Sequence, residues 1–218
     1  FYSNPTWNSG SATTAVIRII NLNTAAGGND FGLDDISFST LSTFIKLLSL
    51  TGSDAQTTCI NTPITDIVYS VGSGATGPVV TGLPAGVTST FNGVNLTISG
   101  TPTVAGNYTY SVTTVGNCNS ITANGTINVQ AQTIALTSGS SIQTVCSNTA
   151  ISNIVFTIGG NATNATVTGL PTGVVMTKSG NVFTISGTPS VAGTFAYTIT
   201  TSGVCNVATA TGTITAQA

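Results

Sequence analysis

An internal repeat of 87 residues constrains this chain more than any other feature of its sequence. Cys59 and Cys146 are 87 residues apart, and Cys118 and Cys205 have the same separation. The motif Gly-Leu-Pro, the hexapeptide Thr-Ile-Ser-Gly-Thr-Pro and the tripeptide Val-Ala-Gly recur at the same interval. Self-similarity at a fixed interval indicates one structural unit used twice, so both copies are expected to share one fold.

The repeat divides the chain into three parts. Residues 52–131 align without a gap with 139–218, and about half of the aligned positions are identical. We therefore predict a leader, 1–44, followed by two units of domain size, 45–131 and 132–218. The second copy ends in phase with the first, which is the pattern expected if further units follow in a longer protein.

Each unit is predicted to consist of short β-strands. Thr makes up about a fifth of the chain, and Val and Ile are plentiful, all of which favour strands. Asn92-Gly93 predicts a tight hairpin, because both residues of such a turn need positive φ. The predicted strands of the first unit are 64–71, 75–81, 87–91, 94–98, 107–113 and 120–129. About seven short strands in fewer than 90 residues predict an all-β fold of two tandem immunoglobulin-like β-sandwiches.

The connection between the units contains neither Gly nor Pro over residues 126–134. This composition predicts that the last strand of the first sandwich runs almost directly into the first strand of the second. A short, extended connection permits little hinge motion, so we expect a semi-rigid pair of domains rather than two beads on a flexible tether.

The rarity of charge excludes several functions. The chain has three Lys and Arg, five Asp, no Glu and no His, with a net charge of −2. Three cations cannot neutralise a row of phosphates, which excludes a nucleic-acid partner. Without His there is no Ser-His-Asp triad, and no other acid–base or nucleophile pattern is visible, so we do not expect an enzyme. The apolar stretches are also far shorter than the ~18 residues of a membrane span.

Four cysteines can pair in three ways. The repeat favours Cys59–Cys118 and Cys146–Cys205, because each unit is then closed by its own disulfide. Such bonds would place the protein in an oxidising compartment, at the cell surface or beyond. The alternatives are free thiols in a cytosolic protein and metal ligation, which is disfavoured because no Cys-x-x-Cys or His is present.

The leader contains the only cluster of carboxylates. Asp30, Asp34 and Asp35 offer the hard oxygen ligands that Ca²⁺ prefers, so a structural calcium is the one cofactor that the sequence suggests. The alternative is that these residues are solvated or accept backbone N–H bonds in a loop. Asp34 and Asp35 are adjacent and point to opposite faces of a strand, which argues against a shared ion and against a glycosidase pair.

The order and spacing of the repeat motifs resemble a known class of protein. Gly82–Val87 followed by Ile98–Tyr108, with Asp54–Thr62 leading in, resembles the tandem immunoglobulin-like repeats of very large Bacteroidetes (flavobacterial) cell-surface adhesins. The resemblance covers about 170 residues and implies export by the type IX secretion system and, for some members, a role in gliding motility. Gly28–Phe38 of the leader resembles the final strand of a jelly-roll, galactose-binding-like domain, which implies that the leader is the C-terminal end of an incomplete β domain.

Three hypotheses of function follow. The first is a set of structural stalk repeats in a large secreted adhesin, which give reach and stiffness for adhesion or gliding. The second is a subunit of an extracellular filament, in which the leader strands complete a neighbour's sheet. The third is a glycan- or calcium-binding module in the leader. The expected partners are neighbouring repeats of the same chain, with self-assembly, surface polysaccharide, or the secretion and motility machinery as further candidates.

Overall fold

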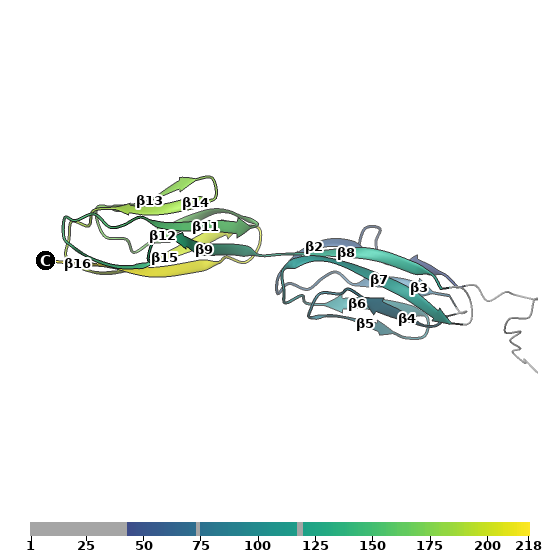
Figure 1. Cartoon of the computed structure of the whole chain (residues 1–218). Coiled ribbons are helices and arrows are strands. Elements are labelled where there is room, and N and C mark those ends of the chain that lie inside the picture. Colours follow the sequence, from purple (N-terminus) through teal and green to yellow (C-terminus); the bar gives the residue numbers. More distant parts are fainter. Residues whose placement is uncertain (1–42, 73–74, 117–119) are drawn as a thin grey trace, which may run out of the picture.

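The computed structural model describes residues 43–218 except 73–74 and 117–119. Within these residues every regular element is a β-strand, and the strands form two sandwiches that follow one another end to end (Figure 1). Each sandwich consists of two four-stranded sheets. The predicted all-β fold of tandem immunoglobulin-like sandwiches is therefore confirmed. The strands predicted in the leader lie in residues 1–42, outside the described part of the chain.

The first unit has eight strands. They are β1 (Ile45–Leu47), β2 (Ala55–Cys59), β3 (Ile67–Val71), β4 (Ala75–Thr81), β5 (Val87–Phe91), β6 (Asn95–Gly100), β7 (Gly106–Gly116) and β8 (Thr122–Gln130). One sheet has the order β1-β3-β6-β5 and the other has the order β2-β8-β7-β4. All neighbouring strands are antiparallel except β2 and β8, which are parallel.

The second unit repeats this topology strand for strand. Its strands are β9 (Gln132–Ser138), β10 (Ile142–Cys146), β11 (Ile154–Gly160), β12 (Ala162–Thr168), β13 (Val174–Ser179), β14 (Val182–Gly187), β15 (Gly193–Gly203) and β16 (Thr209–Gln217). The sheets have the orders β9-β11-β14-β13 and β10-β16-β15-β12, with β10 and β16 as the parallel pair. Two sheets that pack face to face, each combining strands from distant parts of the sequence, are typical of immunoglobulin-like sandwiches.

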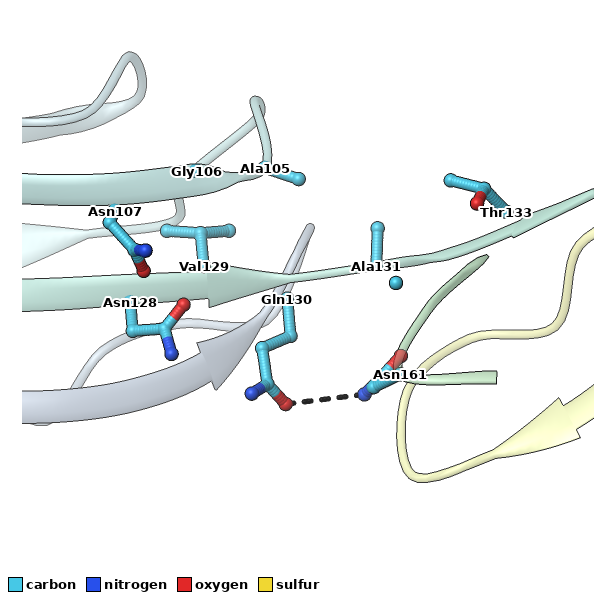
Figure 2. Close-up of a pocket in the computed structure, with 10 residues that line it drawn as sticks. Ala105, Gly106, Asn107, Asn128, Val129, Gln130, Ala131, Thr133 and Asn161 are labelled. Carbon is cyan, nitrogen blue, oxygen red and sulfur yellow. Dashed lines mark hydrogen bonds between the residues drawn. The ribbon is translucent and has the colours of Figure 1, made fainter. Parts of the chain in front are cut away.

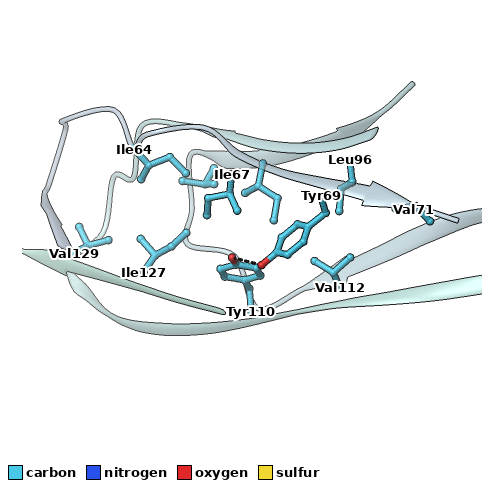
Figure 3. Close-up of a cluster of buried hydrophobic side chains, with 11 residues drawn as sticks. Ile64, Ile67, Tyr69, Val71, Leu96, Tyr110, Val112, Ile127 and Val129 are labelled. Carbon is cyan, nitrogen blue, oxygen red and sulfur yellow. Dashed lines mark hydrogen bonds between the residues drawn. The ribbon is translucent and has the colours of Figure 1, made fainter. Parts of the chain in front are cut away.

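Alternating side chains place the core between the two sheets. In β3 the side chains of Ile67, Tyr69 and Val71 are buried, whereas those between them are half-buried. Side chains that alternate in this way bury one face of a strand. Burial of each Ile or Val side chain contributes roughly 1.5–3 kcal/mol to the free energy of folding. Figure 3 shows this core in the first unit, with Tyr69 and Tyr110 meeting at its centre.

A tyrosine in each unit lies over a glycine of the neighbouring strand. Tyr110 is paired in register with Gly125, and Tyr197 is paired with Gly212. A Cβ atom added at either glycine would overlap the tyrosine hydroxyl and a backbone carbonyl oxygen. These two glycines therefore make room for a buried aromatic ring, which is a packing requirement rather than a turn requirement.

The structure differs from the predicted strand map of the first unit in two added strands, β1 and β2, and in the geometry of one turn. Ala55–Cys59 forms β2, an edge strand that the sequence pattern did not predict, because its side chains are exposed or half-buried and show no apolar alternation. The hairpin at Asn92-Gly93 lies where predicted, but of these two residues only Gly93 has positive φ, at 93°. Asn92 instead accepts the N–H groups of Val94 and Asn95 with its Oδ1 atom.

Candidate functional site: the joint between the repeats

The two sandwiches are connected by a single residue. Strand β8 ends at Gln130 and β9 begins at Gln132, so only Ala131 lies between the last strand of one unit and the first strand of the next. The predicted direct passage from strand to strand is confirmed. We call Gln130–Gln132, together with the side chains that contact these residues, the joint.

A turn of the second unit holds the connecting residue. Asn161, between β11 and β12, donates its backbone N–H to the Ala131 carbonyl at 3.2 Å. Its side-chain Nδ2 donates to Gln130 Oε1 at 3.3 Å, the bond drawn in Figure 2. Gly160, at φ 64°, permits this close approach, because a Cβ atom there would overlap the Ala131 carbonyl oxygen. The turn therefore fixes the direction in which the chain enters the second unit.

A buried glutamine extends the joint into the second sandwich. The Gln132 side chain is only 6% exposed, and its Nε2 donates to the carbonyl of Cys205 at 2.5 Å. A buried amide that is hydrogen-bonded to backbone specifies one arrangement of the groups around it, since every other arrangement would leave the donor unpaired. Gln132 thus holds the loop between β15 and β16 against the start of β9.

A disulfide forms the second covalent connection across the joint. Cys59, the last residue of β2, is bonded to Cys205, with a Cα–Cα distance of 5.4 Å. Cys59 is paired in register with Gln130 and therefore lies at the end of the first unit that faces the second. Cys205 lies in the loop between β15 and β16 and is 7% exposed. The two units are consequently attached both through the backbone and through sulfur.

The predicted pairing of each unit with itself is wrong. Cys146 is a free, exposed cysteine, and it lies opposite Gln217, the last residue of β16. Cys205 precedes β16, which has nine residues and therefore spans roughly 27 Å at ~3.3 Å per residue. A disulfide requires Cα atoms within about 7 Å, so Cys146 and Cys205 lie at opposite ends of one sandwich and cannot pair.

The remaining predicted sites are placed as follows. Cys118 and the leader residues Asp30, Asp34 and Asp35 lie outside the described residues, and the calcium, glycan and strand-complementation hypotheses stay predictions. Among the described residues, no group of three or more His, Cys, Asp or Glu side chains comes together. No helix in this part of the chain is long and apolar enough to cross a membrane.

A shallow recess lies beside the connecting residue. Figure 2 shows it between the end of the first unit and the start of the second. It is lined by backbone and by small or amide side chains, from Ala105, Gly106, Asn107, Asn128, Val129, Gln130, Ala131, Thr133, Gly160 and Asn161. These groups offer hydrogen-bond donors and acceptors, and none of the lining side chains is charged.

Comparisons with known proteins find bacterial adhesins that are similar to this chain in sequence. No protein-family model matches the chain. The serine-rich adhesin for platelets of Staphylococcus aureus strain MRSA252 is 34% identical over 151 residues, which are 66% of this chain and 11% of the adhesin. The corresponding adhesin of strain MSSA476 is also 34% identical over 151 residues, which are 6% of its length. This chain therefore spans about a tenth or less of the adhesins that it matches.

Solved structures give weaker likenesses. A three-domain fragment of titin, I67–I69 in an E-to-A variant, is 12% identical with a TM-score of 0.47 and covers 81% of this chain and 65% of that one. The endo-fucoidan hydrolase MfFcnA4 is 19% identical with a TM-score of 0.28 and covers 75% of this chain and 27% of the hydrolase.

Proposed function

We propose that this chain forms part of the stalk of a large, secreted cell-surface adhesin, in which sandwiches in series provide reach and stiffness. The observation that carries the proposal is the double covalent connection at the joint, through Ala131 and through Cys59–Cys205. A single connection allows the two bodies to rotate about it, whereas a second connection from the neighbouring strand restricts that rotation. The sequence similarity to a staphylococcal adhesin supports the same class of protein.

The disulfide also changes how the chain carries tension. A force applied at the two ends of the described chain passes from Cys59 to Cys205 through sulfur and bypasses the 145 residues between them. These residues include most of both sandwiches. Unfolding of the residues between the two cysteines therefore adds no length to the molecule, which suits a stalk that must limit its extension under load.

The surface composition suits exposure outside a cell. The whole chain has three Lys and Arg residues, so proteases that cleave after basic residues find few sites. The exposed faces of the strands are mainly Thr, Ser and Asn, which remain hydrated without charge. Both features support a long-lived extracellular role.

Solution scattering tests the stiffness of the joint. We expect the oxidised chain to behave as a rigid rod of two sandwiches and the Cys59→Ser chain to sample a wider range of interdomain angles. Cys146→Ser is the matched control, because it removes a cysteine that lies outside the bond. A wild-type chain with the disulfide formed that scatters as flexibly linked particles would contradict the stalk proposal.

Single-molecule pulling tests the path of the force. Without the disulfide, unfolding one unit of about 87 residues should release roughly 300 Å of chain at ~3.5 Å per residue. With Cys59–Cys205 intact, unfolding between the two cysteines should release no length. Full-length steps in the oxidised chain would show that tension does not pass through sulfur.

The secretion route and the role in motility belong to the same proposal. The resemblance of the repeat motifs to Bacteroidetes adhesins supports export by the type IX secretion system, display at the cell surface and a contribution to gliding. Disabling that secretion system in the source organism should remove the protein from the surface. Undiminished surface display in the secretion mutant would exclude this route while leaving the stalk proposal intact.

A further inference from the structure

The free cysteine of the second unit occupies the place that the bonded cysteine occupies in the first. Cys59 ends β2 opposite Gln130, and Cys146 ends β10 opposite Gln217, in the same parallel register. Cys59 lies at the end of the first unit that meets the second. Cys146 therefore lies at the opposite end of the second unit from Cys205, and it is exposed there.

The backbone around the two cysteines is the same. Asn61 and Asn148, two residues after each cysteine, both have φ of 60°, a left-handed conformation that Asn tolerates better than most residues. Asn61 donates its N–H to the Pro102 carbonyl at 2.9 Å, and Asn148 donates to Pro189 at 2.9 Å. The frame that presents Cys59 to the next unit is thus fully formed around Cys146 without a bonded partner.

The other half of the bond is also defined. Cys205 lies in the β15–β16 loop, where its carbonyl accepts the Gln132 side chain. The second unit thus has one cysteine at the end of its second strand and another in its last hairpin loop, at opposite ends of the sandwich. In the joint, the strand-end cysteine comes from the leading unit and the loop cysteine comes from the following one.

We propose that Cys146 forms the same disulfide with a further copy of this repeat, through the cysteine that corresponds to Cys205 in that copy. The joint would then recur at every junction of a longer array, each unit being bonded to the one before it and the one after it. The inference rests on the proposed stalk only in requiring that another repeat follows.

Forming the bond is a two-electron oxidation. The Cys146 thiol and its partner each lose one proton and one electron, and the two sulfurs join. An oxidised disulfide-exchange protein of the secretory compartment, or glutathione disulfide in vitro, takes up the electrons and protons and becomes two thiols. No other group changes.

Successive bonds of this kind overlap along the sequence. Cys146 lies between Cys59 and Cys205, so its bond would begin inside the span that the first bond closes. The loop cysteine of one unit and the strand-end cysteine of the next, such as Cys118 and Cys146, are 28 residues apart in the sequence. The shortest covalent path through an array therefore contains about 28 residues of chain and one disulfide for every two repeats. The fully unfolded array could then reach only about 100 Å per two repeats, against roughly 600 Å without the bonds.

A three-unit protein tests the proposal directly. Residues 132–218 are appended in register after Ala218 of the full chain, and the protein is folded in a glutathione redox buffer. Peptic digestion at acid pH without reductant should give a peptide that links Cys146 to the appended counterpart of Cys205. Cys146→Ser should abolish this peptide and leave the Cys59–Cys205 peptide, whereas Cys59→Ser should do the reverse.

Native material gives the second test. In protein taken from the surface and alkylated before reduction, Cys146 should be protected to the same extent as Cys59. Alkylation of Cys146 in both the native and the three-unit protein would overturn the inference. A rigid three-unit rod with a free Cys146 would leave the stalk proposal standing, and a linked Cys146 in a flexible chain would contradict only the stalk.

Discussion

The two repeats share one topology and give their buried tyrosine hydroxyl an equivalent backbone partner, but the first unit adds a second hydroxyl beside it. In the first unit the hydroxyls of Tyr69 and Tyr110 share a hydrogen bond of 3.0 Å, and the Tyr110 hydroxyl also donates to the Asp54 carbonyl at 3.5 Å. In the second unit Phe156 takes the place of Tyr69, and Tyr197 donates to the backbone carbonyl of Ser141 at 3.1 Å. The comparison shows that the long strand of each unit keeps its tyrosine and that the hydroxyl keeps a backbone carbonyl partner at equivalent positions, 54 and 141, whereas the second hydroxyl is present in the first unit alone.

The two units also differ in their surface charge. Lys178 is the only charged residue of the second unit, and Phe91 occupies the corresponding position of the first. Lys178 donates to the Thr163 carbonyl at 2.9 Å and to Asn164 Oδ1 at 3.1 Å, and its ammonium lies 5.6 Å from the Phe183 ring centre. This is an anchored surface lysine of β13, whose contacts lie on the neighbouring strand β14 and on β12 of the other sheet.

The glycine beneath the tyrosine that both repeats share gives the largest expected effect. Gly125→Ala and Gly212→Ala should each destabilise their own unit by ~3 kcal/mol, because the new methyl group overlaps a ring hydroxyl and a carbonyl that cannot both move aside. Urea unfolding followed by methyl NMR of Ile98 and Ile185, two fully buried and equivalent core residues, measures each unit separately.

Gly77→Ala is the control for these two variants. A Cβ atom at Gly77 meets nothing within 4 Å, and the residue lies within strand β4. We expect this variant to unfold at nearly the wild-type urea concentration. A Gly125→Ala chain as stable as the control would show that the tyrosine ring is not confined by the neighbouring strand.

Alkaline pH should separate the two units next. Burial raises the pKa of Tyr69, Tyr110 and Tyr197 above the ordinary value for tyrosine. Above about pH 10 the unfolded chain releases these protons while the folded chain retains them, so stability falls as pH rises. The first unit, with two such groups, should lose up to ~2.7 kcal/mol per pH unit, and the second should lose up to ~1.4 kcal/mol.

The same methyl signals measure this difference. Urea titrations at pH 9 and pH 11 compare the unfolding free energies reported by Ile98 and by Ile185. Equal losses in the two units would mean that the second tyrosine of the first unit titrates normally. Tyr69→Phe should bring the pH dependence of the first unit down to that of the second.

The fold could be predicted well from the sequence because each strand pattern can be compared with the same pattern in the other repeat. Every alternating strand pattern occurs twice, so chance patterns are filtered out, and the Gly-free passage into β9 was visible in the residues around Ala131. The disulfide pairing was not predictable in the same way. A spacing of 87 is equally consistent with cysteines bonded within one unit and with cysteines bonded between neighbouring units.

The position of β2 distinguishes a disulfide within one unit from a disulfide between neighbouring units, because this strand brings Cys59 beside Gln130. Ala55–Cys59 lacks apolar alternation, so its sequence gave no sign that it lies parallel to β8. Without that strand, Cys59 could not be assigned to the end of the sandwich that faces the second unit. The joint contacts made by Gln132 and Asn161 were missed for a similar reason, since an amide in a polar sequence carries no signal of burial.

Removing the second hydroxyl from the first unit, or adding one to the second unit, gives a smaller expected effect on stability. Tyr69→Phe removes the hydrogen bond to Tyr110 and should destabilise the first unit by ~1 kcal/mol. The reverse exchange, Phe156→Tyr, adds a hydroxyl where the equivalent residue meets a tyrosine, and should change the second unit by no more than ~0.5 kcal/mol. A loss above 2 kcal/mol from Phe156→Tyr, in the same urea assay, would show that the two cores are not interchangeable.

The smallest expected effect concerns the anchored lysine. Lys178→Met should destabilise the second unit by about 0.5 kcal/mol, because it removes two exposed hydrogen bonds and a weak cation–ring contact with Phe183 while keeping the aliphatic chain. Lys178→Arg, which retains the positive charge, is the control and should stay within the error of the wild type. Both are measured by urea unfolding at low and high salt, and the loss should shrink at high salt if charge is its cause. A salt-independent loss of the same size would assign the effect to the two hydrogen bonds of the ammonium group rather than to its charge.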